Sequence, residues 1–324
     1  MNQVNQKAVK DGLKNIAVQM NAESDHNTTG IAVTLPESAI DDAVGSGVDK
    51  FTISSPAASV TLDDISLSEI NSYTNGDVTI RAALNNEASL TNEGRERIGN
   101  RPVYDLRIAS GNTTISDLGG GTATVSLPYT LSNGEDENKI VIYYVSGDGG
   151  LATVPNCAYN ASAHTVTFTT THFSTYAVGY YDVSFSDVSG WYQDYVSFLA
   201  ARNIIRGTSS TTFSPNEVIT RAQFATILAN LSGNDLSEYT TSSFTDVSTT
   251  DWYFRSAEWA FKNGVAVGSG GRFDPNASIT REQMAVMLYN YAKYAGLDVS
   301  NIEGMAIREF SDYGSISNWA MIPI

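Results

Sequence analysis

The clearest pattern of apolar and polar positions occurs twice in the C-terminal half of the chain. The segment FSPNEVITRAQFATILANL, residues 213–231, returns as FDPNASITREQMAVMLYNY, residues 273–291. In the first copy the apolar residues fall at helical spacing, at Phe224, Ile227, Leu228 and Leu231. A return at a fixed period is the signature of a repeat array, so we expect two helical repeats in this region.

Each copy opens with a Thr followed three residues later by a Gln, the capping-box pattern that predicts where a helix begins. In both copies the residue directly after that Thr is an arginine, Arg221 in the first and Arg281 in the second. A cation at the first helical position faces the positive end of the helix dipole, which disfavours it by roughly a few tenths of a kcal/mol. Helix stability therefore explains neither arginine, and a bound anion is one reason for them.

The N-terminal part of the chain is patterned differently. Residues 4–20 have the period of a short amphipathic helix, and two further helices are predicted at 36–44 and 63–70. Short β-branched runs bounded by Gly, Pro, Asp or Asn predict strands at 30–35, 49–54, 58–62 and 76–84. The polar segment 85–101 is expected to be a loop that contains a helical turn.

More alternating runs follow before residue 180, separated by turn signals such as GGG at 119–121. They are PVYDLRIA, TATVSLPY, NKIVIYYV, HTVTFTTT and STYAVGY. This spacing favours an antiparallel sandwich over a parallel sheet. We therefore predict a multidomain α+β protein, with an N-terminal α+β region, an antiparallel β-sandwich and mainly α-helical repeats. The expected boundaries are 1–98 for the α+β region, 99–180 for the sandwich, 181–238 and 239–305 for two repeats, and 306–324 for a truncated third repeat.

Composition narrows the choice of partners. The chain has 324 residues and a formal net charge of -16, which argues against nucleic acid or an anionic membrane surface as a partner. No apolar run reaches the roughly 18 residues of a membrane span, and the first twenty residues lack the apolar core of a signal peptide. If the protein is exported, we expect its signal to lie outside this sequence. The single cysteine, Cys157, allows no internal disulfide and is expected to be a small buried residue.

The second β-rich run contains a recognisable module. Residues 100–180, which include SLPYTL, NKIVIYYVSGDGG and THFSTYAV, resemble the ZU5-like β-sandwich modules upstream of wall-anchoring repeats in surface proteins of Gram-positive bacteria. The resemblance implies a spacer or display module. In some such modules the tripeptide His172-Phe173-Ser174 is cleaved before the serine; in others the histidine only forms structural hydrogen bonds. Self-cleavage needs a strained peptide and a group that activates the Ser174 hydroxyl, and neither is visible in the sequence.

From Val183 a longer repeat unit is visible. FSDVSGWYQDYVSFLAARNIIRG aligns with FTDVSTTDWYFRSAEWAFKNGVAVG, and each precedes one of the two capped helices. FSDYGSISNWAMIPI, from Phe310, starts like a third copy. The order of Phe-x-Asp-Val, Trp-Tyr, Gly, Phe-x-Pro and Ile-Thr-Arg closely resembles the S-layer homology family. That resemblance implies units of strand-like lead, helix, turn and helix in a pseudo-threefold arrangement, which bind a secondary cell-wall polysaccharide that often carries ketal-linked pyruvate.

The resemblance also implies which residues bind the ligand, four from each copy. They are the motif arginine, the lead aspartate, the first-helix tryptophan and the turn glycine, namely Arg221, Arg281, Asp187, Asp246, Trp191, Trp252, Gly207 and Gly268. A guanidinium forms paired, charge-assisted hydrogen bonds with a carboxylate such as that of pyruvate, and N–H groups at a helix N-terminus can add donors. Because Glu282 follows Arg281 where the first copy has Ala222, we expect the groove of Arg221 to bind better.

A purely structural role is the alternative for each of these residue types. The arginines can pair with the lead aspartate of the same or the next repeat. A tryptophan at a helix start usually buries most of its area, and a glycine can end the first helix with a positive φ. Two further aromatic residues inside the first helices, Phe198 and Trp259, are expected in the core.

The sequence favours a protein that is not an enzyme. His26, His164 and His172 are too scattered for a metal site, and the acidic run 134–138 suits a solvated turn as well as a calcium site. We expect no cofactor, no metal and no membrane insertion. The predicted function is non-covalent anchoring of a surface protein in the cell wall through an acidic polysaccharide. The alternative is a display, spacer or adhesin part of a larger surface enzyme, with self-cleavage between Phe173 and Ser174 as a minor activity.

Overall fold

The computed structural model describes residues 17–21, 29–86, 88–299, 311 and 313–320. The chain forms two compact units, and it passes from one to the other three times. The first unit takes Met1–Ser184 and Trp191–Arg202, and the second takes Phe185–Gly190 and Asn203–Ile324. The first helix of the first repeat therefore belongs to the same unit as the strands.

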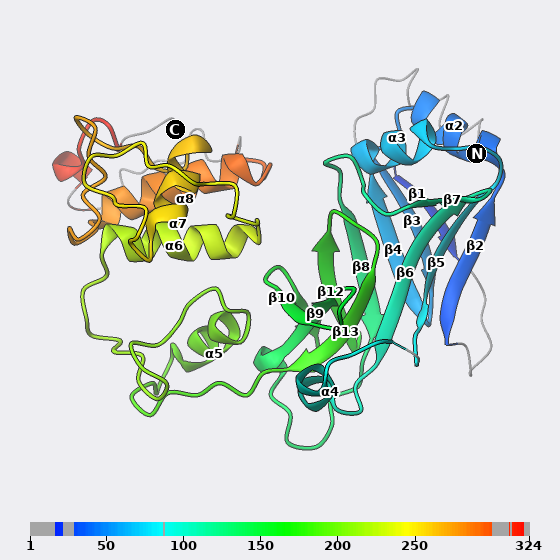
Figure 1. Ribbon diagram of the computed structural model, residues 1–324, viewed down its shortest axis with the longest axis horizontal. Coiled ribbons are helices and arrows are strands. Elements are labelled where there is room, and N and C mark those ends of the chain that lie inside the picture. The colour runs from blue at the N-terminus through cyan, green and yellow to red at the C-terminus, as the bar shows by residue number, and fades with distance from the viewer. Residues whose placement is uncertain (1–16, 22–28, 87, 300–310, 312, 321–324) are drawn as a thin grey trace. The chain divides into compact units, whose positions relative to one another are not determined.

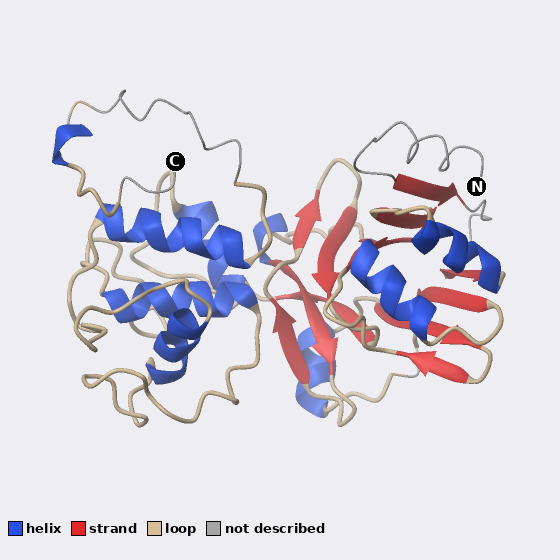
Figure 2. Cartoon of the chain, turned by 90° about the horizontal axis from the view of Figure 1, so that it is seen from above, coloured by secondary structure: helices blue, strands red, loops and turns tan. Residues whose placement is uncertain are grey.

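The first unit is built from two β-sheets (Figures 1 and 2). One sheet has the order β1-β3-β4-β8-β12-β11. Its strands are β1 (Ala17–Asn21), β3 (Lys50–Ser55), β4 (Ala58–Asp63), β8 (Ala123–Pro128), β12 (Thr165–Thr170) and β11 (Ala158–Asn160). The other sheet has the order β10-β9-β13-β6-β5-β2, with β7 paired to β6. Its strands are β10 (Leu151–Val154), β9 (Ile140–Val145), β13 (Thr175–Tyr180), β6 (Val103–Ser110), β5 (Val78–Leu84), β2 (Gly30–Leu35) and β7 (Thr113–Ile115).

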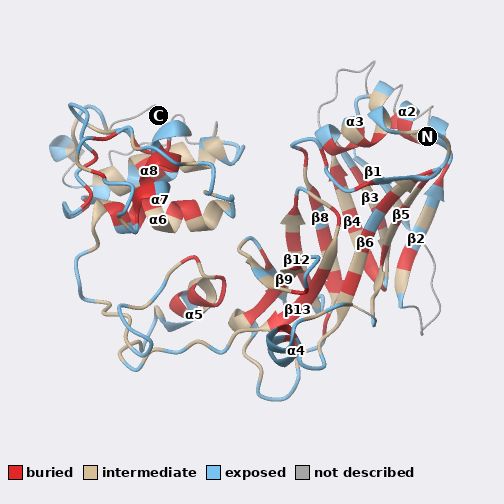
Figure 3. Ribbon diagram, in the orientation of Figure 1, coloured by how far each residue is buried: buried red, intermediate tan, exposed pale blue. Residues whose placement is uncertain are grey.

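Strands from before and after residue 98 are interleaved in both sheets. β4 pairs with β8 and β5 pairs with β6, both antiparallel, and the buried residues of the two regions form one hydrophobic cluster. Burial alternates along these strands, as on β4, where Ala58, Val60 and Leu62 are buried (Figure 3). The expected boundary between 1–98 and 99–180 thus falls inside a shared core, because alternation predicts strands but not their partners.

Helices and a short 3-10 turn complete the first unit. They are α2 (Glu37–Gly45), α3 (Asp64–Ser72), α4 (Asn92–Ile98), η1 (Glu137–Lys139) and α5 (Gln193–Ala201). The predicted helix over 4–20 is wrong for residues 17–20, which lie in β1 and pair in parallel with β3; residues 4–16 lie outside the described residues. Every other pairing of described strands is antiparallel.

In the second unit the described residues form the helices α6 (Arg221–Ser232), α7 (Phe254–Lys262) and α8 (Arg281–Tyr294), and the 3-10 turn η4 (Tyr313–Ser315). The structure confirms both predicted capping boxes, and α6 and α8 begin at the two motif arginines. The core contains Trp259, with no exposed surface, as predicted. Phe198, on α5, is only partly buried. The predicted strand-like leads are turns, since their backbone N–H and C=O groups are held within the repeat instead of by a neighbouring strand.

Candidate ligand-binding site at the junction of the two repeats

The lead aspartates hold the backbone of the Phe-x-Pro turn in their own repeat. The carboxylate of Asp187 accepts hydrogen bonds from the N–H groups of Phe213 (2.8 Å) and Ser214 (2.7 Å). In the second copy, Asp246 accepts from Phe273 (2.8 Å) and Asp274 (2.9 Å). The residue before the proline has a positive φ in both copies, 60° at Ser214 and 54° at Asp274, a region that non-glycine residues seldom occupy. Each of the two carboxylates therefore acts as a clamp, because it holds the backbone of its turn in this seldom occupied conformation.

The turn glycines are required by close packing, and the structural alternative, a positive φ that ends the first helix, does not hold for them. Neither Gly207 nor Gly268 has a positive φ. A Cβ on Gly268 would lie 2.3 Å from the carbonyl oxygen of Arg272 and 2.6 Å from the ring of Phe244, and Gly207 is enclosed in the same way. The positive φ that follows each first helix lies earlier, at Asn203 (55°) and Gly264 (68°).

Arg221 reaches from the first repeat into the second. Its guanidinium lies over the ring of Phe273, 4.9 Å from the centroid, and donates a hydrogen bond to the carbonyl oxygen of Val267, next to Gly268. Burial lowers the pKa of Arg221, and the nearby charge of Asp274 offsets part of that effect, so the side chain stays cationic. The structural alternative, an ion pair with a lead aspartate, does not hold among the described residues. Within the described residues this one hydrogen bond uses one of the five guanidinium N–H donors, and the others have no partner there.

The N-terminus of α6 does not offer the donors that we expected there. The N–H groups of Arg221 and Ala222 donate to the carbonyl oxygens of Ala277 (2.9 Å) and Pro275 (3.0 Å) in the second repeat. The capping box satisfies the next N–H group, on Gln223. An anion at this junction would therefore be held by the Arg221 side chain and not by the helix backbone.

Both first-helix tryptophans are exposed, so the structural alternative, packing in the core, does not hold for them. Trp191 is 83% exposed and Trp252 is 67% exposed. Each stands edge-on to the tyrosine that follows it, at 5.6 Å for Tyr192 and 5.2 Å for Tyr253. Because such a large apolar face is left in solvent, both side chains are free to cover the C–H face of a sugar. Trp191 belongs to the first unit and Trp252 to the second.

The second motif arginine has different surroundings. Arg281 is exposed, and no side-chain partner is found for it in the described part of the chain. Its neighbour Glu282 accepts hydrogen bonds from the N–H (3.1 Å) and hydroxyl (3.2 Å) of Ser317, in the segment that resembles a third copy. Glu282 therefore binds this segment and does not pair with Arg281.

The sequence pattern did not place Val267 or Phe273 in the site. Phe273 could have been suspected, because it is the first residue of the Phe-x-Pro landmark.

The His172-Phe173-Ser174 tripeptide lies directly before β13. The N–H of Phe173 donates to Ser116 (2.7 Å), and the carbonyl of Ser174 accepts from Leu106 (2.8 Å). None of the three residues has a positive φ. His172 packs edge-on against Tyr144 and lies 3.3 Å from the Tyr176 hydroxyl through Nε2. These contacts give the histidine a structural role.

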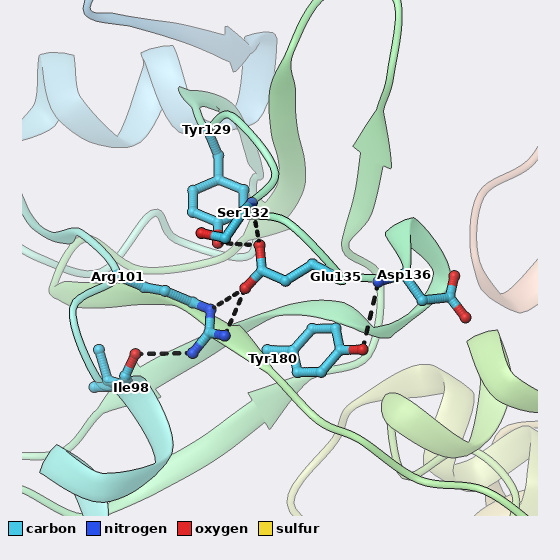
Figure 4. A network of polar contacts seen from close by, with 7 residues as sticks. All are labelled: Ile98, Arg101, Tyr129, Ser132, Glu135, Asp136 and Tyr180. Carbon is cyan, nitrogen blue, oxygen red and sulfur yellow. Dashed lines mark hydrogen bonds and ion pairs between the residues drawn. The ribbon is translucent and has the colours of Figure 1, made fainter.

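The acidic run 134–138 is engaged within the protein (Figure 4). Glu135 accepts hydrogen bonds from Arg101, from the hydroxyl of Tyr129 (2.6 Å) and from the N–H of Ser132 (2.8 Å). Asp136 caps η1 by accepting from the N–H of Asn138 (2.9 Å). Among the described residues no group of three or more His, Cys, Asp or Glu side chains is placed to hold a metal ion.

The repeat region is similar in sequence to a known type of domain. Two stretches, residues 184–225 and 243–285, match the model of the S-layer homology domain. Domains of this kind anchor surface proteins to the cell wall, which indicates a cell-surface location. In the described part of the chain, no helix combines the length and the apolar character that crossing a membrane requires.

Relatives include both enzymes and surface-layer proteins. The chain is 32% identical over 291 residues to an amylopullulanase of Thermoanaerobacterium thermosulfurigenes, which covers 89% of this chain and 15% of that protein. It is 35% identical over 139 residues to the exoglucanase XynX of Acetivibrio thermocellus, covering 43% of this chain and 12% of the relative. It is 30% identical over 138 residues to the S-layer protein sap of Bacillus anthracis, covering 42% and 16%. The chain thus spans a small part of each relative's length.

Proposed function

We propose that this chain anchors a surface protein non-covalently in the cell wall by binding an acidic secondary polysaccharide, and that a pyruvate carboxylate is the group it recognises. The observation that carries the proposal is the position of Arg221. Its guanidinium rests on Phe273, bonds to one carbonyl and has donors left over, which is the arrangement that a carboxylate ligand needs.

The other predicted residues have supporting roles in this proposal. Asp246 and Gly268 shape the turn against which Arg221 lies, and Asp187 and Gly207 do the same in the first repeat. Trp191 and Trp252 offer exposed faces for sugar rings. Arg281 is the weaker binding residue because no aromatic ring of the described chain lies beneath it. We propose domain limits of 181–238, 239–305 and 306–324 for the repeats.

Binding to purified cell wall tests the proposal. We expect the wild-type chain to sediment with wall that carries pyruvylated polymer and to remain in solution after the pyruvate is removed. Loss of charged hydrogen bonds worth about 1.5–3 kcal/mol predicts roughly ten- to hundredfold weaker binding for Arg221→Ala. Arg281→Ala should lose less, and Arg206→Ala, which removes an exposed arginine of the same unit, should bind as the wild type does. Undiminished binding by a folded Arg221→Ala, Arg281→Ala double variant would refute the proposal.

A second candidate function is that of a spacer or display module within a larger surface enzyme. The observation that favours it is the amylopullulanase match, which runs over 89% of this chain and so includes strands of the first unit as well as the repeats. In this proposal the sandwich is a ZU5-like module that is not itself catalytic. Assays of the chain alone on starch and pullulan should show no hydrolysis, and activity there would show that the first unit is catalytic.

A further inference from the structure

The helix α5 is built into the β-sandwich unit although it is the counterpart of α7. Val196, Ala200 and Ala201 on α5 are 7%, 4% and 0% exposed, and Ala201 belongs to the hydrophobic cluster of the sandwich. The helix packs against η1, which precedes β9. Its counterpart α7 is buried instead among the helices of the second unit. Helices at equivalent positions of the two repeats thus pack against different elements.

Arg202, the C-cap residue directly after α5, explains how the sandwich holds this helix. Arg202 is 1% exposed, and its guanidinium donates hydrogen bonds to four backbone carbonyls. They belong to Cys157 (2.6 Å), Asn138 (2.8 Å), Ile140 (2.9 Å) and Phe198 (2.9 Å). The guanidinium also lies 3.5 Å from the centroid of the Phe198 ring.

The arrangement of these four carbonyl oxygens suits a guanidinium better than the side chain of lysine or asparagine. No carboxylate among the described residues pairs with Arg202, so the buried charge faces the Phe198 ring and the carbonyl dipoles, including one from the negative C-terminal end of α5. Four acceptors in different directions match the planar fork of five N–H donors. A lysine offers three donors from a single atom, and asparagine offers two. Removing the guanidinium would leave the carbonyls of Asn138, Ile140 and Cys157 without this donor.

The surface that receives α5 is fixed by contacts of its own. Asp136 caps η1, and Lys139 at its end forms an ion pair with Asp182 (2.6 Å). The thiol of Cys157 accepts a hydrogen bond from the N–H of Ile142 (3.3 Å). The three carbonyls supplied by the sandwich are therefore already oriented toward the guanidinium. In α7 the residue equivalent to Arg202 is Asn263, which bonds to Trp259 and Tyr239 within its own unit.

We propose that the sandwich surface formed by η1, the start of β9 and the Cys157 loop is a docking site for the first helix of the repeats, and that Arg202 is the residue that selects α5 for it. The sandwich is then a structural part of the first repeat instead of a separate spacer. This inference does not depend on which polymer the repeats bind.

Cys157 supplies a native probe of docking because it is the single cysteine and is 1% exposed. Its rate of reaction with an aromatic disulfide reagent is measured in the full chain under native conditions. We expect Arg202→Asn, which introduces the residue of the second repeat, to react at least ten times faster than the wild type. Arg206→Asn removes an exposed arginine four positions on and should react at the wild-type rate.

Hydrogen exchange identifies the element that opens. In Arg202→Asn we expect the amides of α5 to lose at least tenfold protection while those of α6, α7 and β4 keep theirs. Arg202→Lys should fall between the wild type and Arg202→Asn in both measurements. The proposal is overturned if Arg202→Asn labels no faster than Arg206→Asn, if Arg202→Lys behaves as the wild type, or if α5 exchanges together with α6–α8 in the wild type.

Discussion

Removal of the Asp246 carboxylate is the sharpest test of the clamp that shapes the second repeat. Its side chain is 12% exposed and accepts from the N–H groups of Phe273 and Asp274. Phe273 is 1% exposed, so its N–H would be left without an acceptor in Asp246→Ala, and the positive φ of Asp274 would lose its support. Two hydrogen bonds to a charged group, with partial replacement by water, predict a loss of about 2–4 kcal/mol in the free energy of unfolding.

Urea denaturation followed by tryptophan fluorescence measures this loss. Trp259 has no exposed surface, whereas Trp191, Trp252 and Trp319 are 83%, 67% and 53% exposed, so the spectral change reports mainly the core of the second unit. Asp246→Asn should lose most of the same stability, because its amide group is a donor where a second acceptor is needed. Glu217→Ala, at an exposed position, is the matched control.

The pH dependence of the effect follows from the same contacts. Burial raises the pKa of Asp246, but the N–H groups of Phe273 and Asp274 outweigh it and hold the pKa below its ordinary value of 3.8. A lowered folded-state pKa contributes stability that is present above pH 3.8 and is lost as the pH falls through the folded value. The difference between wild type and Asp246→Asn should therefore shrink only below about pH 3.8. If Asp246→Ala lowered the free energy of unfolding by less than about 0.5 kcal/mol at neutral pH, as an ordinary surface substitution does, Asp246 would not stabilise the turn as we infer.

Three further predictions concern other parts of the molecule. Gly268→Ala should destabilise the second unit by about 1–3 kcal/mol in urea denaturation, since its Cβ would overlap the Arg272 carbonyl. Gly314→Ala, where no atom lies within 4 Å of the added Cβ and φ is not positive, meets no such overlap, and equal losses would contradict the steric reasoning. Glu135→Gln should weaken the sandwich at neutral pH in denaturation followed by circular dichroism. Although burial opposes it, hydrogen bonds from Tyr129, Ser132 and Arg101 lower the pKa of Glu135, so this difference should vanish as the pH falls below 4.5, and persistence in acid would count against it. Intact mass after prolonged incubation should show one uncut species, unchanged in Ser174→Ala, because the contacts of His172 with Tyr144 and Tyr176 are structural. A cut before Ser174 would contradict this expectation.

Local patterns carried most of what could be predicted. The capping boxes placed the starts of α6 and α8 at Arg221 and Arg281, because the signal lies within four consecutive residues. Alternation identified most strands, including β4 and β12. The short strands β7, β10 and β11 were missed, since three or four residues are too few to show a period.

Predictions that required long-range partners were less complete. The sequence does not show that β5 pairs with β6, or that the backbone of Ala222 bonds to Pro275 in the next repeat. Glu282 looked like a neighbour that weakens the Arg281 site, but its acceptors are occupied by Ser317, thirty-five positions away. The sequence pattern likewise did not distinguish α5 from α7. In our proposal their different packing partners depend on one residue, which is Arg202 after α5 and Asn263 after α7.

The contact of Arg221 with Val267 and Phe273 means that a single repeat does not contain the whole of this arrangement. A gene duplication copies one repeat, yet the arginine comes from one copy and the aromatic ring beneath it from the next. A substitution at either position must therefore suit the neighbouring repeat. Exchanging the order of two repeats would create new combinations of arginine and ring without altering any single repeat.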